Sequence, residues 1–133
     1  MTDLVFFYGT LMTPFDRAGR MRLTSLLEPV GHGWISAALF DLGIYPAAVP
    51  ADDGQVWGEV NRMVDTDAVL DVLDEIEGHS ETEPDSSLYT RSEFPVILEN
   101  GRRVNAWVYF YNAPLGKAER IESGDYLRHL KVR

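Results

Sequence analysis

The sequence has no cysteine, only three histidines and no long apolar run, and each absence excludes a class of protein. Without cysteine the chain can form no disulfide, thiolate metal site or cysteine nucleophile. The histidines, His32, His79 and His129, share no metal-ligand spacing, so we predict no metal site. No apolar run approaches the ~20 residues of a membrane span, and the N-terminal Met-Thr-Asp lacks the positive segment of a secretion signal. We therefore expect a cytoplasmic protein that does not bind membranes.

Basic residues are scarce as well. The chain of 133 residues carries 12 basic and 21 acidic side chains, for a formal net charge of −9. Thirteen of the acidic residues, but only one basic residue, fall between Trp34 and Thr90. A nucleic-acid partner is therefore not expected, because phosphate binding needs a concentrated basic face. The simplest interpretation of the charge is a solvated acidic surface, and docking of a basic partner protein is the alternative.

The overall composition is that of a small globular protein. Hydrophobic residues make up 45% and charged residues 25% of the chain, which together with the length predicts a single domain over residues 1–133. Short β-rich runs and one clear helix predict an α+β fold in which an antiparallel sheet curls towards a barrel. We expect strands over 3–8, 33–40, 55–60, 89–98 and 104–111, a hairpin turn at Asn100-Gly101, a short helix before residue 28, and a short helix or turn over 119–130.

The clearest element is a helix that runs from Asp65 to Gly78. Asp65 or Thr66 can cap its N-terminus, and Gly78 supplies a C-terminal stop. At about 100° per residue, Glu77 lies at the edge of an apolar stripe rather than on the opposite, acidic face. The stripe consists of Val69, Leu70, Leu73 and Ile76.

The position of Glu77 predicts a raised pKa for its carboxyl group. Partial burial disfavours the charged form, and the C-terminal end of a helix carries negative partial charge. Asp74, Glu75 and Glu81 add like charge nearby in the sequence. These effects move the pKa towards the range in which one carboxyl both accepts and donates protons near neutral pH. The alternative is a helix-end acid that reaches water or pairs with an arginine.

A glycine turn directly follows the first predicted strand. Backbone N–H groups in such a turn can point into a concave site for a carboxylate or an oxyanion. The hydroxyl of Thr10 and the side chain of Tyr8 add polar groups. An ordinary strand-to-turn connection is the alternative, and a phosphate loop is excluded because the downstream Gly-Lys-Ser/Thr is missing. The candidate binding residues are Tyr8, Gly9, Thr10 and Leu11.

Two further tyrosines, Tyr89 and Tyr111, lie in predicted strands. Their hydroxyls either line a pocket, where they can orient a substrate, or form hydrogen bonds at the edge of the core. His79, two residues beyond Glu77, is interpreted as an exposed turn histidine.

Several short motifs resemble, in order, those of the γ-glutamylcyclotransferase-like family, which includes AIG2-like and γ-glutamylamine cyclotransferase proteins. The sequence Tyr8-Gly9-Thr10-Leu11 is similar to the family's N-terminal Tyr-Gly-Ser/Thr-Leu motif. The resemblance covers residues 4–112 and continues through Leu39–Ala47, Val56–Val60, Leu73–Gly78, Tyr89–Arg91 and Ala106–Tyr109.

The resemblance implies a small, mostly antiparallel β-barrel flanked by helices, with a cavity that binds a small γ-glutamyl substrate. It implies that the turn at Tyr8–Leu11 holds the γ-glutamyl group and that Glu77 is the general acid and base. The implied reaction cyclises this group to 5-oxoproline and releases an amine or amino acid, with no metal or other cofactor. A non-catalytic binding or regulatory module of the same fold is the alternative, and the oligomeric state is left open.

An acidic, polar stretch from Glu81 to Ser87 separates the predicted helix from the strand that begins at Tyr89. This stretch is either a flap over the cavity or a longer surface loop. Its negative charge near the site is expected to disfavour anionic leaving groups such as a dipeptide. We therefore expect γ-glutamyl amines to be preferred over glutathione.

Overall fold

A computed structural model of the protein describes residues 1–9, 12, 23–43, 45–80, 82–83, 85 and 87–131. Thr10 and Leu11 of the predicted binding turn lie outside the described residues, as does Glu81. The elements in chain order are β1 (Leu4–Phe7), the 3-10 turn η1 (Thr24–Leu26), β2 (Leu27–Asp41), β3 (Pro46–Met63), α2 (Thr66–Glu77), β4 (Tyr89–Leu98), β5 (Arg103–Tyr111), β6 (Glu119–Arg120) and α3 (Tyr126–Lys131).

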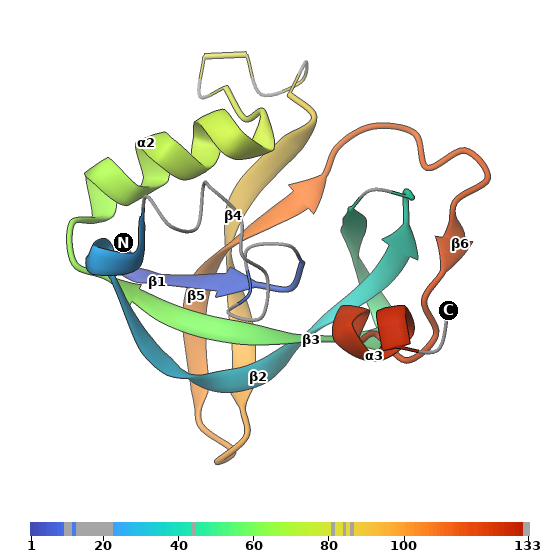
Figure 1. Ribbon diagram of the computed structural model, residues 1–133, viewed down its shortest axis with the longest axis horizontal. Helices are drawn as coiled ribbons and strands as arrows, with labels where there is room; N and C mark the ends of the chain where they lie inside the picture. Colours follow the sequence, from blue (N-terminus) through green and yellow to red (C-terminus); the bar gives the residue numbers. More distant parts are fainter. Residues whose placement is uncertain are drawn as a thin grey trace.

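The described strands close into a barrel. β3, β1, β5, β4 and β2 lie side by side in that order, β2 pairs back with β3, and the short β6 extends the sheet beyond β2. These pairs are antiparallel except β1 with β5, which run parallel with Val5 beside Trp107. The predicted α+β fold with a mostly antiparallel barrel is therefore confirmed, with one parallel pair in it. Figure 1 shows α2 and α3 on different sides of this barrel.

β2 and β3 form one long hairpin, whereas the sequence predicted only the shorter strands 33–40 and 55–60. The pairing register shifts between Ser36, which lies beside Gln55, and Ala37, which lies beside Pro50. The residues between Pro50 and Gln55 therefore bulge out of the ladder, and a proline is tolerated at such a bulge. Because the strand resumes on the far side of the bulge, local composition underestimated its length.

The shorter predicted elements have mixed outcomes. The turn at Asn100-Gly101 joins β4 to β5 as expected, with Gly101 at a φ of 87°. Residues 13–22 of the segment in which a helix was expected before residue 28 lie outside the described residues, and the described part of it contains the 3-10 turn η1. The C-terminal segment contains β6 as well as the helix α3.

Helix α2 agrees closely with its prediction. The carboxylate of Asp65 accepts a hydrogen bond from the N–H of Ala68, and Gly78, at a φ of 68°, ends the helix. The apolar stripe packs on the barrel through the buried residues Val69, Leu70 and Leu73. Among the described residues no helix is long and apolar enough to cross a membrane.

The core lies on both faces of β1, because all four of its residues are buried although neighbouring strand residues point to opposite faces. The fully buried large side chains of the strands include Val5, Phe6, Ile35, Leu39, Val56, Val60, Val96 and Val108.

Candidate functional site

A cavity of about 210 Å³ lies between the C-terminal end of α2 and the barrel. It is built from the end of β1, the turn between β2 and β3, the last turn of α2, the start of β4 and one residue of β5. β3 passes close behind β1 because Gly58 has no side chain; a Cβ there would lie 2.2 Å from the carbonyl oxygen of Phe7. The lining residues are Phe6, Phe7, Tyr8, Gly9, Tyr45, Pro46, Glu75, Ile76, Glu77, Gly78, Leu88, Tyr89 and Tyr109.

The structure brings several predicted site residues together in this cavity, namely Tyr8, Gly9, Glu77 and Tyr89. Tyr111 is not among the described lining residues, and its ring instead packs against that of Tyr89, with the centroids 5.3 Å apart. Thr10 and Leu11 lie outside the described residues. The catalytic and binding roles of all these residues stay predictions.

Glu77 is the last residue of α2 and is half-buried. Burial is the main cause of the raised pKa of both Tyr8 and Tyr109, and the negative charge of Glu77 adds to it in each case. Glu77, Tyr8 and Tyr109 all line the cavity. Two carboxylates at the helix end, those of Glu75 and Glu77, thus line a cavity with tyrosines in its wall.

The hydroxyl hydrogens of these tyrosines are directed to acceptors within the protein. The hydroxyl of Tyr8 donates to the carbonyl of Tyr109 at 2.6 Å, and that of Tyr89 donates to the carbonyl of Pro46 at 2.9 Å. The Tyr109 hydroxyl donates to Oδ1 of Asp74 at 2.5 Å. A hydroxyl with its hydrogen engaged offers a ligand its oxygen lone pairs. For a ligand that reaches them, these hydroxyl oxygens are therefore acceptors rather than donors.

Sequence reasoning missed two tyrosines that line the cavity, Tyr45 and Tyr109. Tyr45 comes from the turn between β2 and β3, and its ring centroid lies 6.2 Å from that of Tyr89. Tyr109 precedes Tyr111 by two residues in β5, so both side chains leave the strand on the same face. The pattern that singled out Tyr111 therefore contained the signal for Tyr109.

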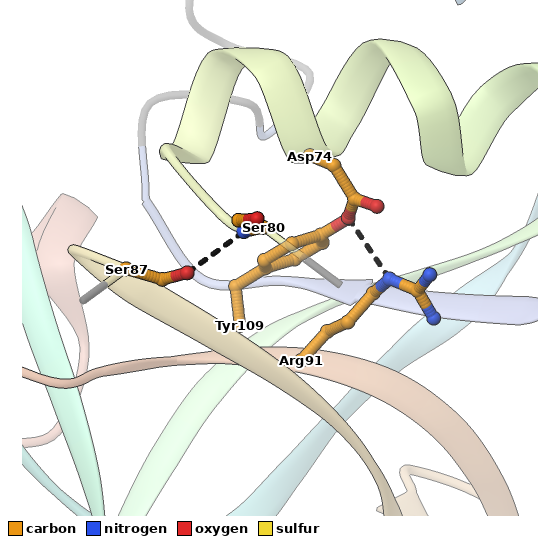
Figure 2. A network of polar contacts seen from close by, with 5 residues as sticks. All are labelled: Asp74, Ser80, Ser87, Arg91 and Tyr109. Atoms are coloured by element: carbon orange, nitrogen blue, oxygen red, sulfur yellow. Dashed lines mark hydrogen bonds and ion pairs between the residues drawn. The ribbon is translucent and has the colours of Figure 1, made fainter. Parts of the chain in front are cut away.

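A buried polar network beside the cavity joins α2 to two strands of the barrel. Nε of Arg91, in β4, lies 2.9 Å from Oδ1 of Asp74, and the two side chains are 10% and 14% exposed. The guanidinium carbon of Arg91 is 4.7 Å from the ring centroid of Trp107 in β5. Figure 2 shows Asp74 pointing down from α2 to Arg91 and Tyr109. The end of the helix is therefore attached to the barrel by charged hydrogen bonds as well as by apolar contacts.

The segment after α2 is closed by its own hydrogen bonds. The N–H of Leu88 donates to the carbonyl of Gly78 at 3.1 Å, and the N–H of Ser80 donates to Oγ of Ser87 at 2.7 Å (Figure 2). Glu83 and Asp85 are exposed and are not among the lining residues. Of the described residues between Gly78 and Tyr89, only Leu88 lines the cavity.

The prediction that His79 is an exposed turn histidine is wrong. Its side chain is half-buried, and its ring meets that of Tyr109 edge-on at a centroid distance of 6.4 Å. A backbone hydrogen bond explains this burial. The N–H of His79 donates to the carbonyl of Asp74, which keeps His79 against the end of α2.

The chemistry that the described lining residues offer is acid–base chemistry. Glu75 and Glu77 supply carboxylates, and aromatic and aliphatic side chains make up much of the remaining wall. Within the part of the chain that the structure describes, no three acidic or histidine side chains converge as metal ligands would.

Comparison with known proteins relates the chain to one family. Residues 5–128 match the family model described as γ-glutamyl cyclotransferase, AIG2-like. The γ-glutamylcyclotransferase family protein YtfP of Escherichia coli strain K12 is 38% identical over 124 residues, which cover 92% of this chain and 95% of YtfP.

Solved structures show the same fold. The solution structure of YtfP from Escherichia coli has a TM-score of 0.68 and 31% identity, over 95% of this chain and 97% of that one. YkqA from Bacillus subtilis has a TM-score of 0.73 and 24% identity over 99% of this chain, but the match spans only 42% of YkqA. An AIG2-like protein of the mouse has a TM-score of 0.65 and 24% identity, over 84% of this chain and 79% of that one.

Proposed function

The chain belongs to the γ-glutamyl cyclotransferase, AIG2-like family, and from this premise we propose that it cyclises the γ-glutamyl group of a small γ-glutamyl amine to 5-oxoproline. The observation that supports this most is that Glu77 lines the same cavity as Tyr8 and Gly9 of the turn after β1. The cavity thus combines a proton-transferring group with the start of a backbone turn, which are the two parts that such a reaction needs.

The reaction is an intramolecular aminolysis. The α-amine of the substrate, in its neutral form, attacks the γ-carbonyl carbon, and a C–N bond forms that closes the five-membered ring. Glu77 takes the proton that the attacking nitrogen loses and delivers it to the leaving nitrogen as the old C–N bond breaks. Atoms and protons balance without a co-reactant, and the products are 5-oxoproline and the free amine.

The cavity walls would contribute by folding the substrate back on itself. Holding the amine close to the carbonyl turns ring closure into a well-oriented step. The tyrosine hydroxyl oxygens, whose hydrogens are engaged elsewhere, are suited to accept hydrogen bonds from the α-amine. Within the described part of the predicted binding turn, Gly9 lines the cavity, and its backbone N–H would stabilise the oxyanion that develops on the γ-carbonyl oxygen.

The preferred leaving group is an amine rather than an anionic dipeptide. The sequence placed the discriminating charge in the stretch from Glu81 to Ser87, but its exposed residues Glu83 and Asp85 are not among the lining residues. Glu75 does line the cavity and is exposed, and Leu88, 40% exposed, adds an apolar surface. A carboxylate at the edge of the cavity repels an anionic leaving group, whereas Leu88 favours an alkyl chain.

The test is release of 5-oxoproline from a panel that contains γ-glutamyl-lysine, simple γ-glutamyl alkylamines and glutathione. We expect turnover of the amine conjugates to exceed that of glutathione, and Glu77→Gln to lower kcat by about 10²–10⁴-fold. Asp71→Asn is the matched control, because Asp71 is an exposed acid on the same helix and is not among the lining residues. Full activity in Glu77→Gln would refute the mechanism, and binding of the conjugates without product would support the non-catalytic module instead.

A further inference from the structure

The last turn of α2 breaks a local rule of helix stability. Asp74, Glu75 and Glu77 bring three acidic side chains to the C-terminal end of the helix, where no basic residue accompanies them. Negative charge at this end interacts unfavourably with the helix dipole, and like charges three residues apart repel each other. Such a conflict calls for a tertiary interaction that offsets it.

For Asp74 the offsetting interactions come from the barrel. Nε of Arg91 and the hydroxyl of Tyr109 both donate to Oδ1 of Asp74, at 2.9 Å and 2.5 Å. Arg91 and Tyr109 lie directly opposite each other in the β4–β5 ladder, so the two donors leave the sheet side by side. Figure 2 shows both reaching the same carboxylate from below the helix. The sheet therefore fixes the two donors relative to each other, independently of their contact with the helix.

The backbone of Asp74 fixes the same end of the helix from the other side. Its carbonyl oxygen accepts hydrogen bonds from the N–H groups of Gly78 and His79. The chain from Asp74 to Gly78 is thus closed by its own backbone and tied to the barrel by one side chain. Glu77 lies inside this closed turn, so its backbone cannot shift without disturbing contacts of Asp74.

The attachment also reaches the opposite wall of the cavity. The hydroxyl of Tyr109 donates a hydrogen bond to Asp74, and its backbone carbonyl accepts one from the hydroxyl of Tyr8. Arg91 lies against the ring of Trp107 on the neighbouring strand, which limits the directions that its guanidinium can take. One residue of β5 therefore relates the position of the helix end to that of the residue after β1.

We propose that Asp74 is a positioning residue for Glu77, and that its bonds to Arg91 and Tyr109 hold the Glu77 carboxylate at the substrate. This inference rests on the proposed cyclotransferase function and adds to it a residue that is not among those lining the cavity. Asp74 touches no reacting atom in this scheme. It acts only through the placement of the last helical turn.

The test compares kinetic constants for 5-oxoproline release in Asp74→Asn, Glu77→Gln and the double variant. Asparagine keeps the shape of aspartate and its Oδ1 acceptor but loses the charge, so the bonds from Arg91 and Tyr109 are weakened while both donors keep an acceptor. We expect kcat to fall about 10–100-fold with KM changed less than about threefold, because a displacement near 1 Å has this effect on an oriented reaction. In the Glu77→Gln background the second substitution is expected to have no further effect.

Rescue and local dynamics separate positioning from general damage. Arg91→Lys is expected to retain more activity than Arg91→Gln, since lysine keeps a charged donor, and Asp71→Asn is expected to match the wild type. Without substrate, amide hydrogen exchange at Gly78 and His79 is expected to quicken in Asp74→Asn, with exchange in the barrel strands unchanged.

The outcomes distinguish the two proposals. Multiplicative losses in the double variant, or unchanged exchange at Gly78, would overturn the positioning role while leaving the cyclotransferase proposal intact. An inactive wild type, or an active Glu77→Gln, would overturn the proposed function and with it the role of the Asp74 bonds in catalysis. A loss confined to Asp74→Asn, absent in the Glu77→Gln background and accompanied by faster exchange, would establish the role.

Discussion

Two arginine–aspartate pairs each join parts of the chain that are far apart in sequence, and they lie in different surroundings. Arg91 in β4 pairs with Asp74 in α2 at 2.9 Å, with side-chain exposures of 10% and 14%. Arg120 in β6 pairs with Asp53 in β3 at 3.2 Å, with exposures of 30% and 73%. The atoms are of the same kind and the distances are similar. The pairs differ in how far their side chains are exposed to water and in which elements of the fold they connect.

This difference shows that contact distance alone does not rank the two pairs. At Asp74 a lost partner leaves a carboxylate charge that water reaches poorly, and such a charge is costly. At Asp53 the hydrogen bond and charge of Arg120 lower the pKa of the carboxyl, but water and salt can replace that partner. The first pair also attaches the helix that carries Glu77, whereas the second joins the short edge strand β6 to β3.

The largest effect is expected from Arg91→Met. Methionine keeps an unbranched stem against Trp107 but removes the charged donor, so Asp74 retains only the hydroxyl of Tyr109. We expect the free energy of unfolding to fall by about 3 kcal/mol, the lower end for a broken buried pair. Urea unfolding monitored by tryptophan fluorescence measures this.

The double variant Asp74→Asn/Arg91→Met provides the control, because it removes both charges. It is expected to be more stable than Arg91→Met alone, since no unpaired carboxylate remains beside the barrel. Equal stability of the single and double variants would show that the unpaired charge is not the cause of the loss.

A smaller loss of stability is expected at alkaline pH, and it arises from two tyrosines that line the cavity. Burial is the main cause of the raised pKa of Tyr8 and Tyr109, so both stay neutral in the fold while unfolded tyrosine ionises above a pKa of about 10. Their contribution is therefore fully present below pH ~10 and is lost as the pH rises further. Between pH 9 and 10.5 we expect the free energy of unfolding to fall by about 1.5 kcal/mol.

Tyr8→Phe checks this assignment, since it removes one of the two titrating hydroxyls. Its stability at pH 8 is expected to differ from that of the wild type, but the informative quantity is the slope against pH. We expect the alkaline slope to be about half as steep. An unchanged slope would assign the pH dependence to other groups.

The sequence predicted well what depends on neighbours along the chain. The capped helix with Glu77 at its buried edge follows from the spacing of apolar residues, and the turn at Asn100-Gly101 follows from glycine's tolerance of positive φ. The barrel class followed from short strands and turns together with the family motifs. These features are local, or repeat along the chain, so one sequence is enough to find them.

The sequence did not reveal contacts that depend on how the barrel closes. Asp74 was counted only as like charge near Glu77, because nothing local says that Arg91, 17 residues away, and Tyr109, 35 residues away, share its carboxylate. The same limit hid the length of β3, which resumes beyond a bulge. Such contacts are set by strand order and register, which short-range patterns do not contain.

The smallest effect is expected from Arg120→Met, the counterpart of the first substitution at the exposed pair. Asp53 then loses its partner but is already 73% exposed, so water replaces the missing hydrogen bonds. We expect urea unfolding and 5-oxoproline release to match the wild type within error, at low salt and in 1 M NaCl alike. A loss of stability as large as that of Arg91→Met would mean that the two pairs stabilise the fold equally. Burial would then not determine how much such a pair contributes in this protein.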